Sequence, residues 1–367
     1  MTAGQSNAHR EDMETTHHLH VADARGMGAV EDDAVDLVVT SPPYPMVEMW
    51  DSVFAELAPA SAEYLDAGNG DAAFETMHGV LDEVWDELAR VLRPGGIACI
   101  NVGDATRTVD GRFQVYPNHA RIVEAFSRRG FEALPDVLWH KPTNSATKFM
   151  GSGMVPPNAY VTLEHEYVLI FRNGERRAFE PGAGHRYESA FFWEERNRWF
   201  TDVWTDVRGR LQELPDDDLR DRAGAFPFEI PYRLCSMYSV YGDTVLDPFW
   251  GTGTTSLAAM VTGRNSVGYE LDAAFLDRFA EQAATVPGRS RSVVERRLDA
   301  HREFVDRRRA DGDGLDYDAT YYEFPVMTSQ EQDIRFYVAD DVERAERERR
   351  YRVGYEPAEK TDLEGGT

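Results

Sequence analysis

The sequence predicts an α/β protein with a Rossmann-like fold, in which parallel strands alternate with helices and an inserted region interrupts the alternation. Three observations support this prediction. Short apolar runs typical of buried strands alternate with segments of helical periodicity. A glycine-rich loop joins one such strand to a helix and then to a further strand, and residues 172–210 break the pattern. The 367 residues are enough for a sizeable hydrophobic core.

Strands and helices can be assigned in chain order through the first half of the chain. Residues 1–18 are polar, and we expect them to be loosely ordered. The apolar run at residues 35–40 predicts the first strand, and apolar side chains spaced three and four apart over residues 74–92 predict a helix. The Pro-Gly-Gly sequence at 94–96 ends that helix. The later elements of this half are expected at residues 97–102 (strand), 121–126 (helix), 137–139 (strand) and 167–171 (strand).

The second half contains one clear βαβ unit. A strand at residues 244–247, a helix at 256–262 and a strand at 266–270 follow one another with a glycine loop between the first two. Beyond about residue 287 the chain is rich in Arg, Asp and Glu, a composition for which we expect solvated helices.

These segments divide the chain into four parts. Residues 1–173 and 226–287 are expected to form the two halves of one domain, with 174–225 as an insertion and 288–367 as a charged extension of unknown role.

The charge is strongly acidic, with a formal net charge of -26 and a pI of about 4.7. Only three of the 39 basic residues are Lys, which leaves 36 Arg. An acid excess with scarce Lys is typical of halophilic proteins. At molar salt the Debye length falls to about 3 Å, so repulsion between such a surface and an anionic partner is largely screened. The net charge therefore reflects habitat more than partner.

Composition also excludes several classes of protein. Two cysteines, Cys99 and Cys235, are too few for a disulfide framework or a Cys-rich zinc site, so we expect reduced thiols. No apolar run reaches the ~18 residues of a membrane span, and no signal peptide precedes the domain, which predicts a cytoplasmic protein without membrane contact. We expect the histidines at positions 17, 18 and 20 to be exposed and incidental rather than metal ligands.

The glycine loop of the βαβ unit is typical of a nucleoside site. It reads Asp247-Pro248-Phe249-Trp250-Gly251-Thr252-Gly253-Thr254-Thr255. Two glycines between a strand and a helix let backbone N–H groups approach a ligand. Glu270 ends the next strand, 19 residues after Gly251, which is the spacing at which an acid binds ribose hydroxyls. The loop has no Lys before its final Thr, so a Walker phosphate loop is excluded.

A second motif, Ser41-Pro42-Pro43-Tyr44, follows the first predicted strand. Two prolines fix the backbone and remove two N–H donors, so carbonyl oxygens at this turn are free to accept hydrogen bonds. An exocyclic base amine is a poor nucleophile, and acceptors for its N–H bonds can favour a more pyramidal nitrogen in the transition state. Ser41 Oγ and the Pro42 carbonyl are the predicted acceptors, and we expect Tyr44 to stack on a base that has left its helix.

Together the two motifs strongly resemble the permuted, beta-class amino-methyltransferases of DNA, in which the catalytic motif precedes the cofactor loop. The resemblance covers about residues 20–175 and 226–275, including the segments at 101–104 and 165–171. It implies a Rossmann-like methyltransferase fold with S-adenosylmethionine as cofactor, no metal, double-stranded DNA with a flipped target base as substrate, and the 174–225 insertion as target-recognition region.

The resemblance also implies roles for single residues. Asp23 looks like the acid that holds the adenine amino group, and Pro227 and Phe228 resemble the segment beside the methionine part of the cofactor. The expected catalytic residues are Ser41, Pro42, Pro43 and Tyr44. The expected cofactor-binding residues are Asp23, Pro227, Phe228, Asp247, Phe249, Gly251, Gly253, Thr254, Thr255 and Glu270.

The serine at position 41 favours cytosine N4 as the methylated atom, since Asp or Asn at that position goes with adenine N6 in the family. Combined with the halophilic composition, the pattern resembles the haloarchaeal methylases that modify CTAG. Methylation at cytosine C5 is excluded, because it needs a Cys nucleophile, usually after Pro, whereas Cys99 follows Ala and Cys235 follows Leu.

Two segments are candidates for DNA contact. Residues 172–210 carry eight Arg against seven acids, and six Phe and Trp side chains lie between residues 191 and 204, a combination that suits phosphates and bases. Residues 137–163 contain no acid and two Lys, and the flexible Met-Gly-Ser-Gly centre at 150–153 makes this segment a candidate for a loop that closes over DNA.

Two other functions share these motifs. An RNA or tRNA amino-methyltransferase would carry the same pair, although no appended RNA-binding module is recognisable. A catalytically silent nucleic-acid-binding protein could keep the fold, but the intact catalytic motif argues against it. The sequence leaves open adenine N6 as target, a homodimer and a restriction partner.

Overall fold

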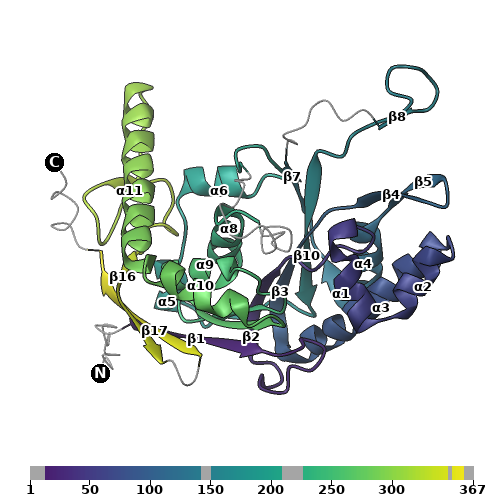
Figure 1. Ribbon diagram of the computed structural model, residues 1–367. Coiled ribbons are helices and arrows are strands. Elements are labelled where there is room, and N and C mark those ends of the chain that lie inside the picture. The colour runs from purple at the N-terminus through teal and green to yellow at the C-terminus, as the bar shows by residue number, and fades with distance from the viewer. Residues whose placement is uncertain (1–12, 142–149, 209–225, 346–348, 359–367) are drawn as a thin grey trace.

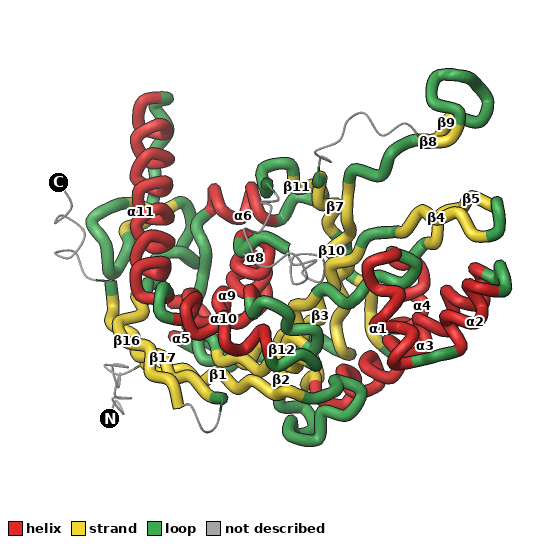
Figure 2. Tube along the Cα trace, viewed as in Figure 1, coloured by secondary structure: helices red, strands yellow, loops and turns green. Residues whose placement is uncertain are grey.

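The computed structural model describes residues 13–141, 150–208, 226–345 and 349–358. One large mixed sheet crosses the molecule, with helices on both faces (Figure 1, Figure 2). Its strands, in spatial order, are β11 (Val203–Trp204), β7 (Val137–His140), β10 (His165–Asn173), β3 (Leu92–Val102), β2 (Val35–Thr40), β12 (Thr244–Asp247), β13 (Asn265–Glu270), β1 (Met13–Val21), β17 (Arg350–Pro357) and β16 (Tyr337–Ala345), and β6 (Phe131–Ala133) pairs beside β10. The short pairs β4 (Ala105–Val109) with β5 (Arg112–Tyr116), β8 (Met150–Gly151) with β9 (Ala159–Tyr160) and β14 (Tyr317–Asp318) with β15 (Pro325–Val326) lie outside it.

The five central strands, β3, β2, β12, β13 and β1, are parallel, which confirms the predicted α/β class. All six residues of β2 are buried, as expected for a strand covered on both faces. Strand β12 lies between β2 and β13, although about 200 residues of chain separate it from β2. The strand that precedes the glycine loop is therefore central in space but late in sequence.

Alternate strand residues face two separate layers of helices. Leu37 and Val39 pack into one core with α8 and α9, whereas Val38 between them packs into the core with α3 and α4. The first layer contains α8 (Glu229–Tyr238), α9 (Thr254–Val261), α10 (Ala274–Ala283) and α11 (Val286–Ala310). The second contains η1 (Glu48–Trp50), α1 (Asp51–Leu57), α2 (Ala60–Asp66), α3 (Gly70–Val91) and α4 (Asn118–Arg128).

The N-terminal segment differs from the prediction. Residues 13–18, expected to be loose, belong to β1, which pairs with β13 on one side and β17 on the other. The expectation that His17 is exposed is also wrong, because its ring is fully buried between Thr15 Oγ1 (2.9 Å) and Ser266 Oγ (2.8 Å). Burial lowers the pKa of His17 to about 3. Thr15 and His17 share the buried face of β1 with Met13 and Leu19, so this strand looks polar in the sequence.

The C-terminal extension is helical only in part. Helix α11 is as expected, but residues 343–345 and 350–352 of the charged run belong to β16 and β17, so the prediction of helices there is wrong. Tyr351, Val353 and Tyr355 alternate with exposed or half-buried residues and pack into the core. A two-residue period is weak evidence when only three apolar residues show it among charges.

The segment that follows β10 packs against this extension. It contains α5 (Gly184–Glu188) and α6 (Trp193–Trp199), and Phe192 shares a small core with Leu298 and Phe336. Glu195 accepts two hydrogen bonds of 2.6 Å from the buried Arg297 guanidinium. Residues 190–204 are thus joined to the C-terminal part of the chain.

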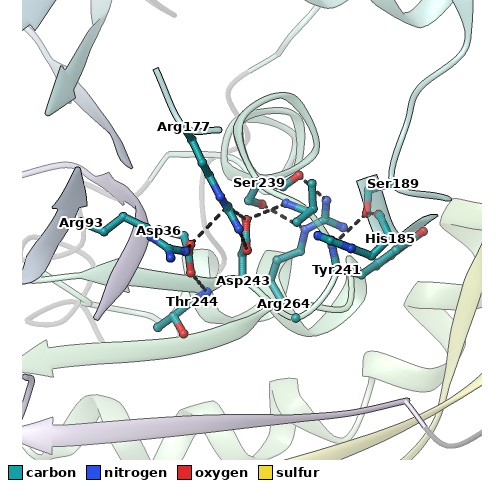
Figure 3. A network of polar contacts seen from close by, with 12 residues as sticks. Asp36, Arg93, Arg177, His185, Ser189, Ser239, Tyr241, Asp243, Thr244 and Arg264 are labelled. Atoms are coloured by element: carbon teal, nitrogen blue, oxygen red, sulfur yellow. Dashed lines mark hydrogen bonds and ion pairs between the residues drawn. The ribbon is translucent and has the colours of Figure 1, made fainter. Parts of the chain in front are cut away.

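The beginning of the same segment is fixed to the amino ends of the central strands (Figure 3). Arg177 donates to Asp243 at 2.6 and 3.0 Å and lies 3.2 Å from Asp36. Asp36 also accepts from the backbone N–H of Thr244 at 2.9 Å and pairs with Arg93. Residues near 177 therefore lie at the edge of the sheet opposite the carboxyl ends of β2 and β12. Residues 172–210, which are predicted to contact DNA, thus begin at the edge of the sheet opposite the catalytic motif. A six-residue strand such as β2 is roughly 20 Å long, and this is the distance between the two edges.

We expect Arg297→Ala to destabilise the protein by about 3–5 kcal/mol, because it leaves the buried Glu195 carboxylate without its cation. The free energy of unfolding, measured by chemical denaturation, checks this. Arg302→Ala is the matched control, since Arg302 lies on the same helix in an exposed pair with Asp299 and should change stability by less than about 1 kcal/mol. Equal effects of the two substitutions would contradict the structural role of the buried pair.

Candidate functional site

The two sequence motifs meet because the strands that precede them are neighbours. Strands β2 and β12 pair in parallel, with Val38 opposite Leu246, so both chains leave the sheet at the same edge. Crevices beyond the carboxyl ends of parallel strands are the usual ligand sites of such sheets. Thr40 donates to Asp247 at 2.6 Å, which joins the last residues of the two strands directly.

A cavity of about 270 Å³ opens at this edge. It is lined by Ser41, Pro42, Tyr44, Val47, Met49, Trp50, Lys141, Glu166, Phe226, Asp247, Phe249, Trp250, Gly251 and Thr252. Six residues expected to be functional therefore share one cavity, and both motifs contribute to it.

The glycine loop has the backbone conformation that its sequence requires. Gly251 and Gly253 adopt positive φ angles of 50° and 79°. A Cβ atom on Gly253 would lie 2.5 Å from the Phe279 ring, so this glycine is required by packing as well. At Gly251 a Cβ atom would meet only the Phe249 carbonyl oxygen, at 3.9 Å, so the loop is open at that point.

One buried and one half-buried carboxylate, Asp247 and Glu270, hold this loop. Asp247 accepts from Thr40 and from the backbone N–H of Phe249 at 3.1 Å, and burial raises the pKa of Asp247 to about 6. Glu270 accepts from the backbone N–H of Gly251 at 2.8 Å, and burial raises its pKa too. Glu270, expected at a ribose, thus lies next to the first glycine, at the end of the neighbouring strand β13.

The remaining loop residues support the turn from behind. Thr255 donates to the Val39 carbonyl at 3.2 Å, which binds α9 to β2, and the Thr254 and Thr252 hydroxyls lie 3.2 Å apart. Thr254, Thr255 and Gly253 do not line the cavity.

Tyr44 of the catalytic motif belongs to a polar network with Asn101, Lys141 and Glu166. No catalytic role was expected for these three residues from the sequence. Tyr44 donates to Glu166 at 3.0 Å, and Asn101 donates to Tyr44 at 2.9 Å and to Glu166 at 2.7 Å. Lys141 donates to the other Glu166 oxygen at 2.6 Å. Burial, reinforced by the Glu166 carboxylate, raises the pKa of Tyr44 well above its ordinary value, so the phenol keeps its proton.

This network determines the orientation of the Ser41 hydroxyl. Ser41 Oγ lies 3.0 Å from Tyr44 Oη, and the single phenolic proton is already donated to Glu166. Ser41 is therefore the donor to Tyr44, and the lone pairs of its oxygen remain available to an N–H group in the cavity. The backbone positions the ring closely as well, because a Cβ atom on Gly103 would lie 3.3 Å from Tyr44 Cε2.

Four further residues expected at the cofactor do not line the cavity: Glu270, whose contact with the loop is given above, and Asp23, Pro227 and Phe228. Asp23 follows β1 at the same edge, and its carboxylate accepts from the Arg25 guanidinium at 2.9 and 2.7 Å. The Phe228 ring stacks on Tyr232 and faces the Arg289 guanidinium, so the neighbouring Phe226 reaches the cavity instead. Pro227 lies between them and does not line it.

Two expectations from composition concern cysteines and membranes. Cys99 and Cys235 are free thiols, as expected, and both are buried. No helix within the described ranges is both long and apolar enough to cross a membrane. The same ranges contain no group of three His, Cys, Asp or Glu side chains arranged to hold a metal ion.

Comparison with known proteins assigns the chain to a family. A family model described as DNA methylase, of the N6/N4 type, matches residues 35–281. The chain is 51% identical over 328 residues to the type II methyltransferase M.MthZI of Methanothermobacter thermautotrophicus, covering 89% of this chain and 91% of that protein. It is 49% identical to the type II methyltransferase M.MjaI of Methanocaldococcus jannaschii, covering 71% and 89% respectively.

A solved structure agrees with this assignment. TTHA0409, a DNA modification methylase homologue from Thermus thermophilus crystallised with S-adenosyl-L-methionine, matches with a TM-score of 0.58 and 33% identity over 74% of this chain and 95% of that chain. The range of the family model includes both motifs and every residue that lines the cavity between them. The chain therefore belongs to the N6/N4 family of DNA methylases.

Proposed function

We propose that this protein is a site-specific DNA methyltransferase that transfers a methyl group from S-adenosylmethionine to N4 of cytosine in duplex DNA. The observation that carries the proposal is the shared cavity, which Ser41 and the open glycine loop both line. The relatives in Methanothermobacter and Methanocaldococcus, both named type II methyltransferases, support the reaction class.

The residues around the loop fit a nucleoside cofactor. Gly251 leaves the loop open, and Glu270 at the end of β13 offers a carboxylate next to it for ribose hydroxyls. Phe249 and Phe226 supply apolar walls. When bound, S-adenosylmethionine supplies the methyl group. Asp23 at the end of β1 is the proposed partner of the adenine amino group, which requires its carboxylate to share or leave Arg25.

The catalytic side prepares an amine to accept the methyl group. Ser41 Oγ and the Pro42 carbonyl accept the two N–H bonds of the target amine, which localises the nitrogen lone pair. Tyr44 holds Ser41 in the accepting orientation, and its ring provides a surface for the flipped base. No acid has to take the proton before transfer, since the loss of a proton from the methylated amine completes the reaction afterwards.

Cytosine is the proposed base because position 41 carries a serine hydroxyl rather than a carboxylate or amide. Adenine N6 is the second candidate, because the family shares this chemistry between the two bases. None of the residues that line this cavity favours adenine over cytosine. The proposed recognition sequence is CTAG, supported by the resemblance of the motifs and of the acidic, Lys-poor composition to the haloarchaeal methylases. A restriction partner and a homodimer remain part of this proposal.

We expect Ser41→Ala to lower kcat by about 10²-fold or more while cofactor affinity stays nearly unchanged, because the lost acceptor acts on the reacting amine. Transfer of labelled methyl groups to DNA, with calorimetry for the cofactor, measures both quantities. Ser127→Ala, an exposed serine at the end of α4, is the control. Wild-type activity in Ser41→Ala would contradict the mechanism.

We expect Asp247→Ala and Glu270→Ala to weaken S-adenosylmethionine binding about tenfold or more, since each removes charge-assisted hydrogen bonds around the loop. Asp277→Ala, an exposed acid on α10, should leave the affinity unchanged. Calorimetric titration of the three variants tests the assignment. Unchanged affinity in both loop variants would show that the cofactor binds elsewhere.

We expect methylated DNA to contain N4-methylcytosine, with highest activity at molar salt. Screening relieves the repulsion of a chain with net charge -26, although it also weakens phosphate contacts, so binding must depend on direct base contacts. Plasmids with and without CTAG, digested by nuclease after reaction and analysed by mass spectrometry, give the product and its sequence context. Detection of N6-methyladenine alone would overturn the assignment of cytosine as the target base. An activity maximum at low salt would overturn the interpretation of the composition as halophilic.

A further inference from the structure

A slender arm projects from the catalytic edge of the sheet. At its base the Lys141 N–H donates to the Glu164 carbonyl at 2.9 Å. Lys141 and Glu166, on either side of this closure, both line the cavity. The described part of the arm, residues 150–163, contains β8 and β9 and extends well away from the body (Figure 1, Figure 2).

The end of the arm is apolar and exposed. The exposed fractions of Met154, Val155 and Val161 are 84%, 65% and 83%. Pro156 and Pro157 follow Val155 directly and are exposed as well. Large apolar side chains gathered at an exposed position are typical of an interaction surface.

The charge of the arm is unlike that of the rest of the chain. Residues 137–163 include no Asp or Glu, although the whole sequence contains 65 acids. A phosphate backbone near the cavity would meet this segment without the repulsion that most of the surface exerts. Charge complementarity therefore favours DNA as the partner.

The arm is supported at its side but not at its tip. The Tyr160 ring stacks on Phe113 of β5, with centroids 4.8 Å apart and planes within 9°. The β4–β5 hairpin starts just after Gly103, which packs against Tyr44. The hairpin and the arm thus lie beside each other near the catalytic residues. Residues 154–157 lie beyond the contact between Tyr160 and Phe113 and are exposed.

We propose that the tip of this arm, Met154 to Pro157, inserts between base pairs of duplex DNA and occupies the stack from which the target base moves into the cavity. This inference rests on the proposed function. A base must leave its helix before its amino group can be methylated, and unstacking is costly. Met and Pro are among the side chains that proteins use as wedges between base steps.

The double variant Met154→Ser/Val155→Ser tests the arm in the full-length protein. On a duplex that the wild type methylates, we expect kcat/KM to fall about tenfold or more, because the wedge no longer offsets unstacking. On the same duplex with an abasic site opposite the target, where less pairing is lost, the variant should approach wild-type activity. Val115→Ser, an exposed apolar residue on β5, is the control and should behave as the wild type.

Fluorescence of 2-aminopurine placed beside the target base reports unstacking without methyl transfer. We expect wild type and Ser41→Ala to raise it and the double variant not to, so a failure of the chemistry would be distinguishable from a failure of the arm. Equal kcat/KM of wild type and double variant, or an equal loss on paired and abasic duplexes, would overturn the proposal. A dimer of the wild type that the double variant loses in light scattering, with equal losses on both duplexes, would assign the arm to a second copy of the chain instead.

Discussion

The parallel pairing of β2 with β12 is the constraint on which the site depends. Because the two strands run in the same direction side by side, their carboxyl ends bring Ser41 and Asp247 to one edge, although 206 positions separate them in the sequence. The hydrogen bond from Thr40 to Asp247 fixes the two ends at 2.6 Å. Its acceptor is buried, and a buried carboxylate is stable only when it is hydrogen-bonded. This pair of side chains therefore couples the shape of the loop to the catalytic turn.

The elements nearest this pairing were the most predictable from sequence. The strand at 35–40 is apolar throughout because it is covered on both faces, and the glycines at 251 and 253 are needed for backbone conformations that other residues rarely adopt. Such requirements are local and leave a direct trace in the sequence. The two motifs were recognised for this reason, and the cavity confirms that they meet.

What sequence reasoning missed depends on contacts between distant segments. The burial of His17 is possible because Ser266, on another strand, supplies a hydrogen bond, and nothing near His17 in the sequence indicates it. Glu166 is similar, since its position beside Tyr44 follows from the antiparallel pairing of β10 with β3. The charged run in β16 and β17 forms strands because β1 offers an edge with which β17 can pair. Propensity is overridden in each case by a partner that the local pattern does not specify.

The order of the motifs along the chain matters less than the adjacency of the strands. A ligand at the carboxyl edge contacts the loops that follow β2, β12 and β13, and these loops stay neighbours whichever strand comes first in the sequence. The chain can therefore begin with the strand of the catalytic motif and reach the cofactor loop about 200 residues later without moving either one. The adjacency of these strands also explains why strands can be added at the outer edges of the sheet. Strands β17 and β16 extend the sheet beyond β1, and β11 extends it beyond β7. Additions at either edge leave the central pairing of β2 with β12 intact.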